Sequence, residues 1–183
     1  MKPSKKALSK AVSILKKGGV VICPTDTVYG FLADATNKKA VEKIYKIKKR
    51  PKSKPLPIFV KDINMAKELA FIDTDHEKVL KKYWPGKYTF VVKLKVAHKN
   101  NTIALRVPKH PFLQKLLKKI NKPLAQTSVN ISGEETLTRI QDIVDTFGKE
   151  KSVSLIIDGG DIKKGKSSKI IDISKNTINI LRK

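Results

Sequence analysis

The chain has 183 residues, 40% of them hydrophobic, which is enough to fold around one proper core. Lysine and arginine total 40 against 16 acidic residues, and the formal net charge of +24 favours anionic partners such as nucleotides or nucleic acid. The single cysteine excludes an intrachain disulfide, and no signal peptide or apolar run of about 18 residues is present. We therefore expect one cytoplasmic domain over residues 1–183, without a membrane segment.

Helical and strand patterns alternate along the chain. Apolar residues at helical spacing predict helices, and short apolar runs between turn residues predict strands. In chain order, the predicted elements are a helix at 4–17, strands at 20–23 and 31–35, a helix at 38–49, a strand at 58–60, helices at 62–70 and 75–83, strands at 89–94 and 103–107, a helix at 111–120, a strand at 124–127, a helix at 138–147, and strands at 153–157, 169–173 and 177–181. This interleaving predicts an α/β fold with a mixed sheet and flanking helices.

Two loops that follow predicted strands are rich in polar side chains. Residues 24–30 read Pro-Thr-Asp-Thr-Val-Tyr-Gly, and residues 128–133 read Ser-Val-Asn-Ile-Ser-Gly. An ordinary turn needs one or two such residues, so the first segment indicates a binding loop on a rigid scaffold. The second offers hydroxyl and amide groups to a ligand, although an Asx or Ser turn that caps the next helix also explains it.

A basic run follows the predicted helix at 38–49. Lys48, Arg50, Lys52 and Lys54 alternate with other residues, so an extended backbone would place these cations on one side, as a triphosphate requires. A solvated basic turn beyond a helix is the commoner explanation of such a run. The glycine-rich motifs GxxxxGK[ST] and GxGxxG are both absent, so an ATP site here would use side-chain hydroxyls and cations.

Arg106 lies at the end of a predicted apolar strand, just before Pro108, where it could face the carboxylate of a ligand. The three histidines are far apart in the sequence and predict no metal site. The residues suggest neither a Ser-His-Asp arrangement nor an activated cysteine, so nucleophilic catalysis is not expected.

Six segments, taken in order, resemble the YrdC-like threonylcarbamoyl-AMP synthase family. They are residues 24–30, the Lys48-x-Arg50-Pro51 run through residue 56, residues 84–86 with 89–91, residues 103–111, residues 128–133 and residues 156–160. The resemblance extends from about residue 7 to the C-terminus. It implies a twisted mixed sheet with a concave basic cleft. We expect the chain to lack the additional C-terminal domain of some members.

The resemblance also implies an activity. The family forms threonylcarbamoyl-adenylate and pyrophosphate from L-threonine, bicarbonate or carbon dioxide, and ATP, with Mg²⁺ expected to bridge the phosphates. Partner transferase proteins then pass the threonylcarbamoyl group to an adenosine of certain tRNAs. Such a reaction brings several anions together, which is consistent with a site rich in cations and hydroxyls that has no obvious general base.

Matching positions carry the implied roles of the family's site residues. The threonine site would contain Thr25, Arg106, Thr127 and Ser168, and the ATP site would contain Lys48, Arg50, Lys52, Thr102, Ser128, Asn130, Thr136 and Arg182. Lys48 and Arg50 would be the catalytic cations, and no residue is predicted to bind a metal.

Two other hypotheses remain open at this stage. The charge of +24 is compatible with a domain that binds tRNA or double-stranded RNA without making the adenylate, although a general lysine bias explains it more simply. Ser168-Lys169 stands where the family often has Ser-Thr, which leaves room for another carbamoyl-type substrate. The presence of Thr25, Arg106 and Ser128-x-Asn130 favours the synthase.

Overall fold

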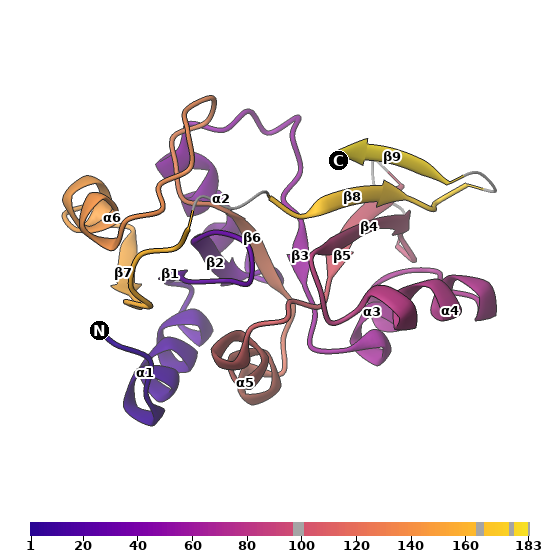
Figure 1. Cartoon of the computed structure of the whole chain (residues 1–183), viewed down its shortest axis with the longest axis horizontal. Helices are drawn as coiled ribbons and strands as arrows, with labels where there is room; N and C mark the ends of the chain where they lie inside the picture. The colour runs from indigo at the N-terminus through magenta and orange to yellow at the C-terminus, as the bar shows by residue number, and fades with distance from the viewer. Residues whose placement is uncertain (97–100, 164–166, 176–177, 183) are drawn as a thin grey trace.

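The computed structural model describes residues 1–96, 101–163, 167–175 and 178–182 (Figure 1). The described helices are α1 (Lys5–Lys16), α2 (Lys38–Lys48), α3 (Ile63–Leu69), α4 (Thr74–Tyr83), α5 (Pro111–Ile120) and α6 (Ile140–Phe147). The described strands are β1 (Val20–Cys23), β2 (Gly30–Asp34), β3 (Ile58–Phe59), β4 (Tyr88–Lys93), β5 (Thr102–Arg106), β6 (Leu124–Ser128), β7 (Val153–Ile156), β8 (Lys169–Asp172) and β9 (Asn179–Arg182). The predicted α/β fold and its elements are confirmed to within about two residues. Residue 177, the predicted start of the last strand, lies outside the described residues.

The strands form one mixed sheet in the order β7-β1-β2-β6-β3-β5-β4-β8-β9. Three neighbouring pairs are parallel, namely β1 with β7, β3 with β5, and β4 with β8. The centre of the sheet is formed by β3, which is only two residues long and pairs with β5 on one side and β6 on the other. This register places Phe59 of β3 beside Arg106 of β5, the residue predicted to face the carboxylate of a ligand.

Local sequence explains where the helices begin. The side chain of Ser4 accepts a hydrogen bond from the backbone nitrogen of Ala7 at 3.1 Å, and Asn37 does the same for Ala40 at 3.1 Å. At the other end of α2, Lys49 takes a left-handed conformation with φ of 50°. That residue stops the helix at Lys48 and redirects the basic run.

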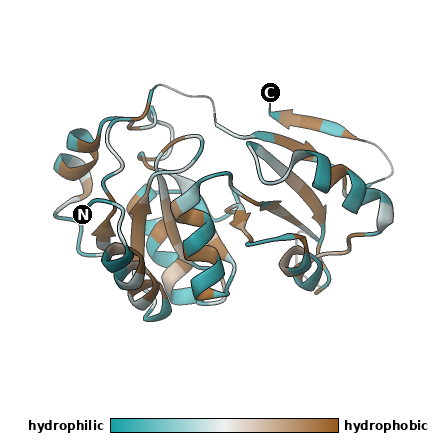
Figure 2. Ribbon diagram, turned by 60° about the horizontal axis from the view of Figure 1, so that its bottom comes forward, coloured by the Kyte–Doolittle hydropathy of each residue, from teal (hydrophilic) through white to brown (hydrophobic). Residues whose placement is uncertain are grey.

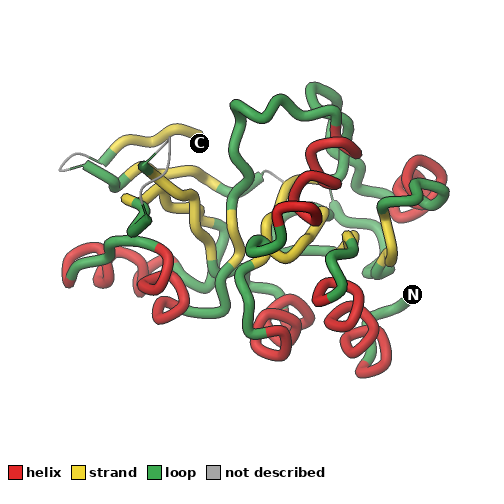
Figure 3. Tube along the Cα trace, turned by 180° about the vertical axis from the view of Figure 1, so that it is seen from behind, coloured by secondary structure: helices red, strands yellow, loops and turns green. Residues whose placement is uncertain are grey.

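Helices cover both faces of the sheet around β1, and this explains why β1 is apolar at every position. Val21 and Cys23 belong to the cluster under α1 and α5, whereas Val20 and Ile22 belong to the cluster under α2 and α6. A third cluster packs α3 and α4 against β4 and β5. Figure 2 shows helices with hydrophilic outer faces packed beside hydrophobic strands, and Figure 3 shows from behind the helices at the two ends of the sheet. No helix in the described ranges is both long and apolar enough to cross a membrane.

Candidate functional site

A cleft of about 300 Å³ opens where β5, β6, β8 and β9 approach one another. Predicted site residues that line it are Arg50, Arg106, Thr127, Ser128, Ser168 and Arg182. Its walls also include Thr27, Gln126 and apolar side chains such as Val91 and Leu181. Among the described residues, three arginines and no carboxylate line the cleft, so its electrostatic potential favours an anionic ligand.

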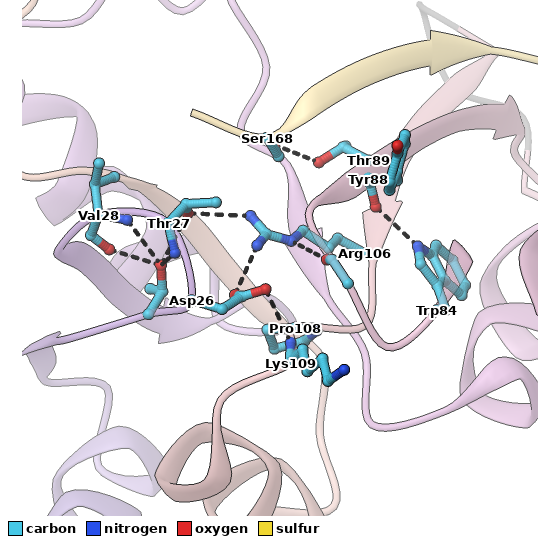
Figure 4. A network of polar contacts seen from close by, with 12 residues as sticks. Asp26, Thr27, Val28, Trp84, Tyr88, Thr89, Arg106, Pro108, Lys109 and Ser168 are labelled. Carbon is cyan, nitrogen blue, oxygen red and sulfur yellow. Dashed lines mark hydrogen bonds and ion pairs between the residues drawn. The ribbon is translucent and has the colours of Figure 1, made fainter. Parts of the chain in front are cut away.

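Arg106, at the end of β5, is the most buried cation of the cleft, with 2% of its surface exposed. Its Nε donates to the carbonyl of Gly86 at 2.9 Å, its Nη1 to Oγ1 of Thr27 at 3.3 Å, and its Nη2 to Oδ1 of Asp26 at 2.6 Å (Figure 4). The guanidinium lies over the ring of Phe59, 5.6 Å from the centroid. Burial lowers the pKa of Arg106 and Asp26 raises it. The group stays a cation, since an arginine starts far above neutral pH.

Gly86 supplies the carbonyl that holds Nε, and its backbone approach explains the glycine. A Cβ at this position would collide with the backbone oxygen of Tyr83. The turn formed by residues 84–86 therefore brings a bare backbone against the guanidinium. This gives the Trp84-Pro85-Gly86 segment a structural purpose in the site.

The loop at 24–30 is organised by its own hydroxyls. Oγ1 of Thr25 donates to the carbonyl of Val28 at 2.6 Å and accepts from the backbone nitrogen of Thr27 at 3.0 Å. Because the one hydrogen of Thr25 goes to Val28, the 2.9 Å contact between the two threonine hydroxyls has Thr27 as its donor. Of the two threonines in this loop, Thr25 shapes the loop and Thr27 lines the cleft.

Tyr29 fixes the base of this loop to the segment at 156–160. Its hydroxyl donates to the carbonyl of Gly160 at 2.7 Å and accepts from the nitrogen of Gly159 at 2.9 Å. A Cβ on Gly159 would contact Pro24 closely, so the two segments meet backbone to ring. Residues far apart in the sequence thereby hold one loop in place.

Lys48 supports the second polar loop from beneath. Its Nζ donates to the carbonyl of Ser128 at 2.6 Å and to the carbonyl and side-chain oxygens of Asn130 at 2.7 and 2.8 Å. Oγ of Ser128 donates to the same side-chain oxygen at 2.7 Å, and Nδ2 of Asn130 donates to the carbonyls of Ile131 and Glu134, each at 2.8 Å. Burial, followed by the charge of Arg50, lowers the pKa of Lys48 to about 8. Its three acceptors match the three donors of an ammonium.

The segment forms a turn beyond the helix, as the commoner explanation of the run predicts, and the alternative that Lys48, Arg50, Lys52 and Lys54 converge on one side of an extended backbone is wrong. Lys48 still belongs to α2 and is buried, and the left-handed Lys49 leads into a turn in which the nitrogen of Lys54 donates to the carbonyl of Pro51 at 3.0 Å. Arg50 lines the cleft, where its Nε and Nη2 donate to the carbonyls of Lys54 and Pro55. Lys52 forms an exposed ion pair with Glu42. A spacing of two places side chains together only in an extended backbone, which this segment lacks.

Ser168 links the far wall of the cleft to β9. Nε of Arg182 donates to the carbonyl of Ser168 at 2.9 Å and Nη2 to its Oγ at 3.1 Å. The same Oγ forms a hydrogen bond with Oγ1 of Thr89 at 2.8 Å, in which either hydroxyl can donate. Burial and the charge of Arg106 both lower the pKa of Arg182.

The neighbouring Lys169 does not line the cleft. Its Nζ lies over the ring of Tyr88 at 6.0 Å, in a second cavity of about 690 Å³ that also contains Asp26, Lys109 and Ser167. The departure from Ser-Thr at this position therefore lies outside the cleft. Thr102, at the start of β5, and Thr136, after the second polar loop, are also absent from its lining.

Sequence reasoning overlooked Asp26 and Thr27 as site residues. Both lie within the polar loop that it identified, but the direction of each side chain depends on hydrogen bonds inside the loop. The signal available in the sequence was the carboxylate of Asp26, because the loop that contains it was expected to face cations. Within the described ranges, no group of three or more histidine, cysteine, aspartate or glutamate side chains could hold a metal ion.

Comparison with known proteins places this geometry among relatives. The family model Sua5_yciO_yrdC, described as telomere recombination, matches residues 13–183. A protein of Methanocaldococcus jannaschii, provisionally named threonylcarbamoyl-AMP synthase, is 38% identical over 94% of this chain and 85% of its own length. The structure of E. coli YciO superposes with a TM-score of 0.88 at 32% identity, covering 100% of this chain and 91% of that one.

A further solved structure is that of a relative with a bound amino acid. It is that of P. abyssi Sua5 complexed with L-threonine, with a TM-score of 0.87 and 32% identity. The match covers 96% of this chain but 53% of that one, so the chain spans about half the length of this relative.

Proposed function

The chain belongs to the Sua5/YciO/YrdC family, and on that premise we propose that it is an L-threonylcarbamoyladenylate synthase. This nucleotidyltransferase would convert L-threonine, bicarbonate or carbon dioxide, and ATP into threonylcarbamoyl-AMP and pyrophosphate. The names of several relatives and the threonine complex of P. abyssi Sua5 support this proposal over an RNA-binding module without enzymatic activity.

The observation that carries the proposal is the buried guanidinium of Arg106 in a cleft lined by hydroxyls. Within the described ranges, its contacts with Gly86, Thr27 and Asp26 leave one N–H on each terminal nitrogen. That is the number of donors which a bidentate carboxylate accepts. We assign the α-carboxylate of threonine to this position, with the hydroxyls of Thr127 and Ser168 in the same cleft.

The proposed chemistry needs neutralisation of charge more than proton transfer by the protein. The amine of threonine reacts with bicarbonate, loses water and becomes an N-carboxylate. An oxygen of that carboxylate attacks the α-phosphorus of ATP, and the bond to the β-phosphate oxygen breaks as pyrophosphate leaves. Arg50 and Arg182, which line the cleft with Arg106, would hold the phosphates and stabilise the added negative charge in the transition state.

Mg²⁺ would enter the site with ATP. No carboxylate of the part of the chain that the structure describes lines the cleft, so the ion would be coordinated by phosphate oxygens and water, a mode that Mg²⁺ commonly adopts. Lys48, Ser128 and Asn130 would act by shaping the loop that borders the nucleotide, since their polar atoms bond to one another. Transfer of the product to tRNA would require separate transferase proteins.

The test is the release of pyrophosphate from ATP and bicarbonate, measured with L-threonine, with serine, with glycine and without amino acid. Release that depends on threonine supports the synthase. No release with any amino acid, combined with salt-sensitive tRNA binding, would replace it with an RNA-binding module.

A further inference from the structure

Asp26 is a nearly buried carboxylate that joins two segments of the chain. Its side chain is 8% exposed. Oδ1 accepts from Nη2 of Arg106 at 2.6 Å, and Oδ2 accepts from the backbone nitrogen of Lys109 at 3.1 Å (Figure 4). The polar loop at 24–30 is thereby fixed to the residues that follow β5. Such a link would hold both walls at the amino-acid end of the cleft.

The same carboxylate restricts the orientation of Arg106. Gly86, Thr27 and Asp26 each accept from a different nitrogen of the guanidinium, so its plane is fixed from three directions. Gly86 and Thr27 are uncharged acceptors, and Asp26 supplies the negative charge that a buried arginine requires. Loss of this charge would leave the guanidinium desolvated and free to turn.

Two opposite consequences for an anionic substrate follow from this pair. The charge of Asp26 repels a second carboxylate, whereas its hydrogen bonds direct the two remaining N–H groups. A misdirected guanidinium would lose its bidentate contact with the carboxylate of the substrate. The ion pair between Asp26 and Arg106 exists before the substrate binds, so the gain in threonine binding from a correctly oriented guanidinium outweighs the repulsion between the two carboxylates. The position of Asp26 also matters, since it lines the second cavity and leaves the face of Arg106 in the cleft uncovered.

We propose that Asp26 is a positioning residue for the amino-acid substrate, holding the guanidinium of Arg106 in the orientation that receives the α-carboxylate. The inference rests on the proposed function and adds to it a residue that does not itself touch the substrate. The alternative is that the Asp26 carboxylate competes with the substrate for Arg106 and has to leave before threonine binds. The test must separate these two roles.

The test compares Asp26→Asn with Asp145→Asn, an exposed substitution on α6 that removes the same charge outside the cleft. Asparagine keeps the shape but turns one acceptor into a donor, so it cannot satisfy both Arg106 and Lys109. Threonine binding is measured by calorimetry on the protein alone, and KM for threonine, KM for ATP and kcat by pyrophosphate release. Thermal unfolding confirms that each variant is folded.

In Asp26→Asn we expect Kd and KM for threonine to rise by about tenfold or more, with KM for ATP within about twofold and kcat reduced by less than about threefold. Asp26→Glu, which keeps the carboxylate, should recover part of the threonine affinity. Asp145→Asn should match the wild type in every constant.

Unchanged or tighter threonine binding in Asp26→Asn overturns the inference, and tighter binding identifies the carboxylate as a competitor. If Asp26→Asn does not fold, Asp26→Ser removes the same charge, and wild-type threonine affinity in that variant overturns the inference as well. A wild-type protein that binds no threonine overturns both the proposed function and this inference. Threonine binding without turnover overturns the proposed synthase activity but not this inference, because calorimetry on the variants still decides the role of Asp26.

Discussion

Lys48 reaches from the end of α2 to the loop after β6, where its Nζ lies 2.7 Å from the backbone oxygen of Asn130 and 2.8 Å from its side-chain oxygen. A third donor is directed to the carbonyl of Ser128. The lysine that begins the basic run is therefore a buried support of a loop, and its neighbours Arg50 and Lys52 lie in different surroundings.

Lys48→Met should lower both stability and activity. Methionine fills a similar volume but leaves buried acceptors unpaired, which costs about 1–3 kcal/mol of the free energy of unfolding. Loosening of the loop at 128–133 should reduce kcat/KM by on the order of a hundredfold, the effect of losing precise electrostatic groups. Urea unfolding and steady-state kinetics check this, with Lys52→Met as a surface control. A loss of activity at full stability would instead assign Lys48 to the phosphates.

Activity should decline as the pH rises through about 8, the pKa of Lys48. The neutral amine has two N–H donors for three acceptors, so one bond of the loop is lost. The same ammonium titrates near 10.5 in the unfolded chain, so between pH 8 and 10.5 the unfolded state holds more protons. The contribution of Lys48 to the free energy of unfolding therefore rises with pH as activity falls.

A pH profile of kcat together with NMR titration of the Lys48 side chain measures this. Burial raises the pKa of both Cys23 and Tyr29, so neither group is expected to titrate at this point. A flat profile between pH 7 and 9.5 would contradict the role given to the ammonium.

Arg106→Lys should impair threonine use much more than ATP use. Lysine keeps the positive charge, which spares Asp26 from being a buried unpaired carboxylate, but it cannot present a planar pair of donors. We expect KM for threonine to rise by about 10- to 100-fold and KM for ATP to change by less than about threefold, from the loss of a bidentate contact. Equal losses for both substrates would place the carboxylate elsewhere.

The two residues at the start of β8 should differ sharply in their effects. Ser168→Ala removes a hydroxyl that accepts from Arg182 and shares a hydrogen bond with Thr89, so kcat/KM should fall by about tenfold, the loss of one or two hydrogen bonds. Lys169→Thr restores the pair that the family often carries, outside the cleft, and should change kcat/KM by less than about twofold. Comparable losses in both variants would mean that Lys169 reaches the substrates.

Hydrophobic periodicity and the turn residues between apolar runs were sufficient to predict the fold. Ser4, Asn37 and the glycine pair at 18–19 mark the ends of helices by chemistry that is local in the sequence. The site was predicted less completely because it depends on side-chain direction. Thr25 and Thr27 are two positions apart in the same loop. Thr25 bonds within the loop and Thr27 accepts from Arg106, and this difference depends on the long-range approach of Arg106. For the same reason, Lys48 could not be distinguished from a phosphate ligand, because its contacts with Ser128 and Asn130 join segments far apart in the sequence.

The most direct test of the central claim uses ¹³C-bicarbonate with ATP and L-threonine, followed by mass analysis of the adenylate formed. The proposed reaction predicts one product containing AMP, threonine and a single labelled carbon, in equal amount to the pyrophosphate released. An adenylate of threonine without the labelled carbon, or AMP alone, would contradict it, because the N-carboxylate would not then be the group that attacks the α-phosphorus.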